Sequence, residues 1–288
     1  MQRRQFLAGG AVLGALCVLP APAACGAQDA LVRRIRFVMT FNNPTPALLT
    51  GQMFWGYLPA QALPRQRLQA VQVSMPHSVR EDALGHRILE LAFAPFPGLG
   101  QQVVTVTAEV QLGAAPAAQA AAGPGKGWQG AERYIESDAP AIVALAATLR
   151  RPQAVDSARA IYDWVRANLQ YAGYVADDHG ALDALSSGRG DCTEYANLVV
   201  ALARAAGLPA RMVGGYVLDR DSAPRPSDYH NWAEVYLDGD WRLLDAQKEH
   251  WFEPAEQYLA FRYYRDQSIN PVGLAHRYRL QGQLQVRL

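Results

Sequence analysis

The stretch that most constrains the fold of this chain is Gly188–Ala196, which indicates a glycine-containing loop running directly into a helix. From Cys192 onward, apolar residues recur at helical spacing until Gly207 ends the pattern. Asp191, followed three residues later by Glu194, forms a capping-box pattern. The sequence therefore predicts a helix that begins with Cys192 at its first position, and we expect Glu194 to serve as a cap rather than as an acid catalyst.

A cysteine at the first position of a helix is suited to act as a nucleophile. Unpaired N–H groups and the helix dipole at a helix start favour a thiolate, which is the reactive form of cysteine. The negative charge of the neighbouring Asp191 opposes a second anion. A nucleophile at Cys192 would therefore need a cationic partner, such as an imidazolium.

Two alternating runs joined by Asp238–Gly239 predict a hairpin. If the turn has two residues, Leu237 pairs with Asp240. Counting outward from that pair puts His230 and Asp245 on the same face, as diagonal neighbours about 7–8 Å apart at the backbone. A three-residue turn would put them on opposite faces. The sequence favours the first arrangement.

Cys192, His230 and Asp245 together make a nucleophile, a base and a group that orients the base. His230 would accept the thiol proton, and Asp245 would fix the imidazole tautomer. The thiolate would attack a carboxamide carbonyl, leaving a thioester for water or an amine to resolve. The backbone N–H of Cys192 is a natural oxyanion donor. Candidates for the second donor are Tyr171, Tyr174 and Trp128.

Further motifs surround these residues. They are Gly188-x-Gly-Asp-Cys192-x-x-Tyr-Ala, Gly207–Arg211, Gly215-Tyr216, His230–Val235 and Trp241-x-x-x-Asp245. Over residues 132–252 this pattern resembles the bacterial transglutaminase-like domain of the papain-like cysteine peptidase superfamily. The resemblance implies that Cys192, His230 and Asp245 are the catalytic triad. It also implies an α+β fold, in which a helical lobe packs its Cys helix on an antiparallel sheet carrying His and Asp. Ala246 departs from the family, which commonly has Pro there.

The remaining sequence divides by composition. Short alternating runs separated by turn residues predict an N-terminal β-sandwich over residues 31–112, a domain that family members often carry. Residues 113–130 are rich in Ala, Gly and Pro and predict a linker. We assign the catalytic core to residues 131–255 and a C-terminal extension to residues 256–288. In the extension we expect a helix and one closing strand, with no assigned function.

Residues 1–27 have the pattern of an export signal. Arg3–Leu7 resembles a twin-arginine motif, and the apolar run that follows is too short to span a bilayer comfortably. We expect a periplasmic or secreted bacterial protein. Lipidation at Cys25 is the weaker alternative, because Pro22 stands where a lipobox has Leu.

Composition excludes several classes of function. The net charge is +1 and the basic residues are scattered, so we expect no nucleic-acid partner. The three cysteines form no C-x-x-C pair, and we expect no metal or cofactor. A disulfide between Cys25 and Cys192 is the alternative to a catalytic thiol. Oligomeric state is left open.

We therefore expect an exported cysteine-dependent acyl-transfer enzyme acting on amide bonds of peptides or proteins. Hydrolysis and amine transfer would use the same residues, and the resemblance to papain-like enzymes makes us favour a peptidase or amidase. The alternatives are a protein-glutamine transglutaminase and a catalytically silent binding scaffold, although a scaffold would be expected to lack a triad residue. An arylamine-acetyltransferase-like acyl carrier is disfavoured, because Cys192 follows a helical lobe and no nucleotide site is evident.

Overall fold

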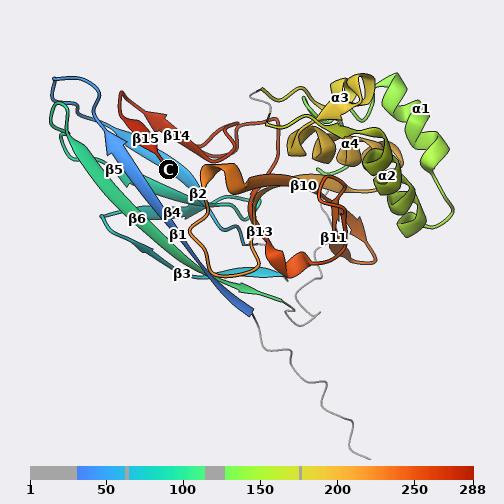
Figure 1. The fold of residues 1–288 in the computed structure, drawn as a ribbon, viewed down its shortest axis with the longest axis horizontal. Coiled ribbons are helices and arrows are strands. Elements are labelled where there is room, and N and C mark those ends of the chain that lie inside the picture. Colours follow the sequence, from blue (N-terminus) through green and yellow to red (C-terminus); the bar gives the residue numbers. More distant parts are fainter. Residues whose placement is uncertain (1–30, 62–64, 114–126, 175–176) are drawn as a thin grey trace, which may run out of the picture.

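A computed structural model describes residues 31–61, 65–113, 127–174 and 177–288. The expected export signal and most of the expected linker lie outside these ranges. A lobe of helices lies at one end of the molecule and long strands extend to the other, with a further sheet between them (Figure 1). The fold is therefore α+β, as the sequence predicts.

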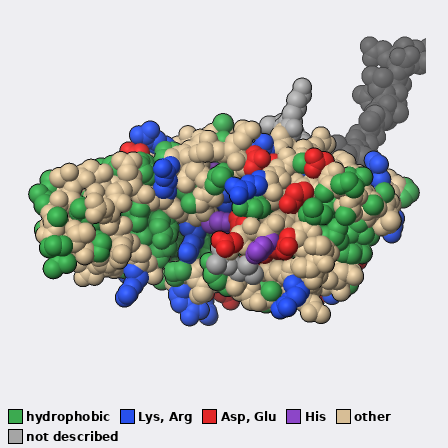
Figure 2. Space-filling view, turned by 90° about the horizontal axis from the view of Figure 1, so that it is seen from above, with side chains coloured by type: hydrophobic (Ala, Val, Ile, Leu, Met, Phe, Trp, Pro, Cys, Tyr) green, Lys and Arg blue, Asp and Glu red, His purple; other side chains and the backbone are tan. Residues whose placement is uncertain are grey.

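The surface carries charges of both signs. Basic and acidic side chains are interspersed on the face shown in Figure 2, consistent with the net charge of +1. Within the described ranges, every helix is too short or too polar to cross a membrane.

Two four-stranded antiparallel sheets make up the strand-rich end. The first has the order β15-β1-β6-β3 and the second β14-β2-β5-β4. The strands are β1 (Leu31–Asn42), β2 (Met53–Leu58), β3 (Gln66–Val73), β4 (Ser78–Glu81), β5 (Arg87–Ala92), β6 (Gln101–Leu112), β14 (Tyr278–Gln281) and β15 (Gln285–Arg287). Apolar side chains from both sheets fill a shared core that includes Phe41, Phe54, Leu91 and Val104. The end of the chain thus supplies one closing strand to each sheet, whereas the sequence predicted one strand in all.

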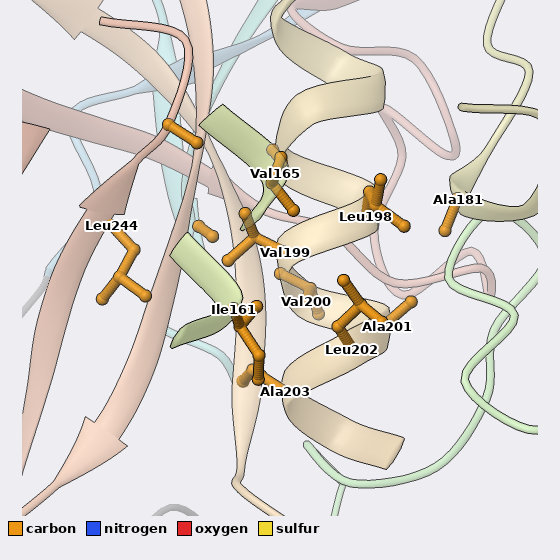
Figure 3. Packing of buried hydrophobic residues seen from close by; sticks show 14 of the residues in the cluster. Ile161, Val165, Ala181, Leu198, Val199, Val200, Ala201, Leu202, Ala203 and Leu244 are labelled. Carbon is orange, nitrogen blue, oxygen red and sulfur yellow. The ribbon is translucent and has the colours of Figure 1, made fainter. Parts of the chain in front are cut away.

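The helical lobe is built around one buried helix. It comprises α1 (Pro140–Leu149), α2 (Ala154–Asn168), α3 (Ala181–Ser187) and α4 (Cys192–Ala205). Every residue of α4 from Thr193 to Arg204 is buried, because the other helices and the central sheet surround it. Figure 3 shows Val199 of α4 beside Ile161 and Val165 of α2, and Leu198 on the side of α4 that faces Ala181 of α3. The predicted Cys helix is confirmed and lies at the centre of the lobe.

The central antiparallel sheet has the strand order β12-β11-β10-β9-β13. Its strands are β9 (Ala210–Val217), β10 (Tyr229–Leu237), β11 (Asp240–Asp245), β12 (His250–Trp251) and β13 (Tyr258–Tyr263). The expected helix in the C-terminal extension is wrong, since that segment is β13. All six residues of β13 are buried. A strand covered on both faces loses the alternating pattern that distinguishes it from a buried helix.

The N-terminal strands hold β13 in place. The side chain of Gln66 accepts a hydrogen bond from the backbone N–H of Ala260 and donates one to its carbonyl, both at 2.8 Å. The N–H of Tyr263 donates to Nε2 of the buried His86 at 2.7 Å. These contacts join the segment that contains Gln66 and His86 to β13, the edge strand of the central sheet.

Candidate active site

The start of α4 has the predicted capping box. The carboxylate of Asp191 accepts a hydrogen bond from Thr193 N–H at 2.7 Å, and Glu194 accepts one from Asp191 N–H at 3.1 Å. Gly190 is required here, because a Cβ at that position would lie 2.3 Å from Cβ of Glu194. The helix therefore begins at Cys192, and Glu194 caps it as expected.

A short parallel pair of strands places Tyr171 beside this loop. In β7 (Gln170–Tyr171) and β8 (Arg189–Gly190), Tyr171 pairs with Gly190, two residues before Cys192. Partial burial, and then the nearness of the Cys192 sulfur, raise the pKa of the Tyr171 hydroxyl. Of the three candidates for the second oxyanion donor, Tyr171 alone is among the described residues that line the cleft with Cys192. Tyr174 is 86% exposed, and Trp128 packs against Trp241 in a separate apolar cluster.

The hairpin has the predicted register. Leu237 pairs with Asp240, and both turn residues, Asp238 and Gly239, have positive φ, as a two-residue primed turn requires. His230 and Asp245 consequently meet. Nε2 of His230 lies 2.6 Å from Oδ2 of Asp245, and both side chains are buried.

Asp245 is held as a carboxylate by hydrogen-bond donors. Oδ1 accepts from the backbone N–H groups of Gln247 at 3.2 Å and Lys248 at 3.0 Å. Burial by itself raises the pKa of Asp245, but hydrogen bonds from His230 and Tyr258 and the charge on His230 outweigh burial and lower it. An ionised carboxylate only accepts, so Nε2 of His230 carries the proton and donates it. Nδ1 is then the ring atom left to accept a proton in neutral His230.

Cys192 and His230 line one cleft of about 410 Å³. The other polar residues that line it include Tyr171, Asp219, Arg220, Asp228, Gln247 and Lys248. Cys192 is partly exposed there and is a free thiol. The alternative disulfide partner, Cys25, lies outside the described residues.

The thiol of Cys192 is not acidic in its resting environment. Burial, followed by the charge of Asp191, raises its pKa to about 12, and a hydrogen bond from the backbone of Asn231 offsets only part of this. The favourable helix-dipole effect is worth about 0.3–1 kcal/mol, less than one pKa unit. Burial and Asp191 therefore outweigh the dipole, and a thiolate at Cys192 needs a proton acceptor within reach.

One contact at the site was missed by the sequence analysis. Nδ2 of Asn231 donates to Oγ1 of Thr193 at 3.0 Å, and these side chains are 3% and 6% exposed. The bond ties the residue after Cys192 to the residue after His230. Its only sequence signal is that both polar residues directly follow the expected catalytic ones.

Two further residues, Arg211 and His179, are not among the described residues that line the cleft. Arg211 forms an ion pair with Glu234 at 2.6 Å, and its guanidinium lies over the rings of Trp241 and Tyr263. Arg211 therefore holds the sheet together. His179 is exposed and, in the described part of the chain, does not contribute to the lining of the cleft.

Residues 143–246 match the family model of the core of the transglutaminase-like superfamily. The match contains all three expected triad residues. This part of the chain is a transglutaminase-like domain.

The transglutaminase-like domain and its flanking sheets also resemble solved structures. A candidate cysteine protease from Cytophaga hutchinsonii has 20% sequence identity and a TM-score of 0.59, with 90% of each chain covered. This likeness shows that the fold extends over nearly the whole chain. The periplasmic domain of TgpA from Pseudomonas aeruginosa is more distant, with 15% identity, coverage of 73% of this chain and 86% of that one, and a TM-score of 0.40.

A curated relative matches over a shorter range. The uncharacterized protein ML0607 of Mycobacterium leprae (strain TN) is 31% identical over 108 residues, or 36% of this chain. The match spans 38% of the length of that relative.

Proposed function

We propose that this protein is a cysteine-dependent amidase or peptidase that uses Cys192, His230 and Asp245 through a thioester intermediate. The observation that carries the proposal is the 2.6 Å contact between His230 and Asp245 in a cleft that also contains the thiol at the start of α4. Nucleophile, base and orienting group are the parts that amide cleavage by a thiol needs.

In the first half of the reaction, Cys192 Sγ attacks the carbonyl carbon of an amide while its proton passes to Nδ1 of His230. The imidazolium is stabilised by Asp245 through the Nε2 hydrogen bond. Collapse of the tetrahedral intermediate breaks the C–N bond, and His230 gives its Nδ1 proton to the departing amine. The acyl group then remains on sulfur as a thioester.

In the second half, water attacks the thioester carbonyl and gives a proton to Nδ1 of His230. The C–S bond breaks, the sulfur takes that proton back, and a carboxylic acid leaves. We propose two groups to hold the oxyanion of each intermediate. The N–H of Cys192 has no partner within its helix because it is at the first helical position, and Tyr171 lines the same cleft and carries a hydroxyl donor.

Hydrolysis rather than amine transfer is supported by the polarity of the cleft. Charged and amide side chains such as Asp219, Arg220 and Gln247 line it, so water has ready access to the thioester. Transfer to an amine would benefit from a dry cleft that excludes competing water. A protein-glutamine transglutaminase is the second candidate function, and a silent binding scaffold is the third.

The proposal is tested by alkylation and turnover. Purified protein is treated briefly with iodoacetamide across pH 4 to 9, and mass spectrometry locates the labelled cysteine. We expect Cys192 to be labelled at least about tenfold faster at pH 7 in wild type than in His230→Ala, since loss of the base leaves a thiol of high pKa. Cys192→Ala, which lacks the proposed nucleophile, serves as the control for labelling at any other site.

Turnover is measured on a peptide mixture with and without a fluorescent primary amine. New carboxyl termini that disappear in Cys192→Ala would establish hydrolysis. Incorporation of the amine into glutamine side chains would instead favour the transglutaminase. Equal labelling in wild type and His230→Ala, with no turnover in either assay, would favour the scaffold.

We also infer export to the periplasm or the outside of the cell. The support is the twin-arginine-like pattern and short apolar run of residues 1–27. Cell fractionation of the tagged protein should place it outside the cytoplasm, and Arg3→Lys with Arg4→Lys should retain it inside.

A further inference from the structure

The carboxylate of Asp245 has a second side-chain partner, which comes from beyond the matched domain. The hydroxyl of Tyr258, at the start of β13, lies 2.7 Å from Oδ2 of Asp245, the same oxygen that His230 contacts. Nδ1 of His250 lies 2.7 Å from that hydroxyl. His230, Asp245, Tyr258 and His250 thus form one continuous chain of hydrogen bonds.

The direction of each bond in this chain follows from the number of hydrogens available. Tyr258 has one hydroxyl hydrogen, and ionised Asp245 can only accept, so Tyr258 donates to Asp245. Burial, and next the charge of Asp245, raise the pKa of Tyr258, so the hydroxyl keeps its proton. His250 must then donate from Nδ1 to the tyrosine oxygen. Each donor in the chain is used once.

Strand pairing sets this geometry. Asp245 ends β11 and pairs with His250 of β12, so the chain returns immediately beside the carboxylate. Tyr258 pairs with Val217 at the other edge of the sheet, and its ring packs against Trp232 at 5.0 Å. The ring is thereby fixed with its hydroxyl directed at Asp245.

Tyr258 is not placed to touch a substrate. The described lining of the cleft includes His230 but neither Tyr258 nor His250. The ring of Tyr258 also lies 6.4 Å from the ring of His230, so it is the effect of the Tyr258 hydroxyl that passes through Asp245. The hydrogen bond from Tyr258 holds Oδ2 of Asp245 in the position where it also accepts from Nε2 of His230. Asp245 is only 2% exposed, so this bond is stronger than it would be in water.

We propose that Tyr258 is a positioning residue for the triad, supported by His250, so that the segment after the matched domain completes the catalytic centre. The inference rests on the proposed function for its kinetic consequences. The restraint on Asp245, however, exists whether or not the cleft turns over a substrate.

The test compares Tyr258→Phe with Tyr263→Phe. Both tyrosines are buried on β13, but in the described structure only the hydroxyl of Tyr258 contacts Asp245. Phenylalanine keeps the ring contact with Trp232 and removes one hydrogen bond to a charged group. We expect kcat of Tyr258→Phe to fall about tenfold with KM unchanged, and kcat of Tyr263→Phe to stay within about twofold of wild type.

The role of His250 is tested by conservative replacement. His250→Asn retains a side-chain N–H near Nδ1 and should keep more of the wild-type kcat than His250→Leu, which has no donor. If His250 acts through Tyr258, the double variant with Tyr258→Phe and His250→Leu should be no slower than Tyr258→Phe alone. If the factor by which kcat falls in the double variant is the product of the two single-variant factors, His250 does not act through Tyr258.

A proton NMR measurement separates this inference from the proposed function. The Nε2 proton of His230, in a buried 2.6 Å bond to a carboxylate, should resonate far downfield and be missing in His230→Gln. Tyr258→Phe should shift this signal and Tyr263→Phe should not. If the wild type is inactive but Tyr258→Phe still shifts the His230 signal, only the proposed function is contradicted. An unshifted signal, or an active wild type with unchanged kcat in Tyr258→Phe, would overturn the positioning role.

Discussion

The bond between Thr193 and Asn231 offers a quantitative test of how the site is held together. Thr193→Val removes the acceptor at nearly constant shape and leaves Nδ2 of Asn231 buried without its partner. Oδ1 of Asn231 already has no hydrogen-bond partner within the described residues. A buried donor left unsatisfied costs about 1–3 kcal/mol, so we expect Thr193→Val to lower the free energy of unfolding by about 2 kcal/mol.

The partner variant should cost less. Asn231→Leu removes both amide atoms, including the unpartnered oxygen, and leaves only the Thr193 hydroxyl without its bond. We expect a loss of about 1 kcal/mol. Replacing both residues removes both halves of the bond, so the double variant should lose only about 1 kcal/mol, well below the roughly 3 kcal/mol expected from additive effects.

Urea unfolding of the four proteins measures these values. Thr148→Val, an exposed threonine on α1, is the matched control and should change stability by less than about 0.5 kcal/mol. Thr193→Val should also reduce kcat about tenfold, because the bond joins the segments that carry Cys192 and His230, and because the Thr193 side chain also hydrogen-bonds the Cys192 thiol and lowers its pKa. If the double variant loses the sum of the two single losses to within about 0.5 kcal/mol, the two side chains do not stabilise the fold through their shared bond. If Thr193→Val is destabilised but keeps the wild-type kcat, the bond does not position the catalytic residues.

Three further outcomes are expected. Tyr171→Phe should lower kcat about tenfold if its hydroxyl holds the oxyanion, while the alkylation rate of Cys192 stays unchanged; an unaltered kcat would remove Tyr171 from the mechanism. Asp82→Asn should destabilise the protein chiefly above about pH 4. Burial by itself raises the pKa of Asp82, but hydrogen bonds from His86 and Asn270 outweigh burial and lower it. The ionised Asp82 therefore stabilises the folded protein at pH values above its pKa in the unfolded chain, and this stabilisation is lost as pH falls through its lower pKa in the folded protein. The difference in unfolding free energy between wild type and Asp82→Asn should therefore shrink between pH 6 and pH 3, and a constant difference would contradict it. Leu198→Ala, in the centre of α4, should lower the free energy of unfolding in urea by about 3 kcal/mol, because the lost side-chain atoms leave a cavity. A loss below about 1 kcal/mol would mean that neighbouring side chains of the lobe move into that cavity.

The local features of the site could be predicted from the sequence. The capping box around Cys192 spans residues three apart, and the hairpin register depends on a two-residue turn at Asp238–Gly239. Both arise from short-range backbone geometry, which residue types specify directly. That is why the helix start and the facing of His230 and Asp245 were predicted and confirmed. Their catalytic roles, and the domain boundaries proposed from composition, stay predictions.

Contacts between distant segments were decided only by the tertiary structure. Tyr258 reaches Asp245 because β13 pairs with β9 across the sheet, and its uniformly buried side chains gave no alternating signal in the sequence. The acidity of Cys192 is likewise a property of its surroundings. Its position at a helix start is encoded locally and favours a thiolate, whereas the burial that raises its pKa comes from packing of the whole lobe. Sequence determines local geometry through neighbouring residues, while burial and long-range hydrogen bonds depend on how all the elements pack together.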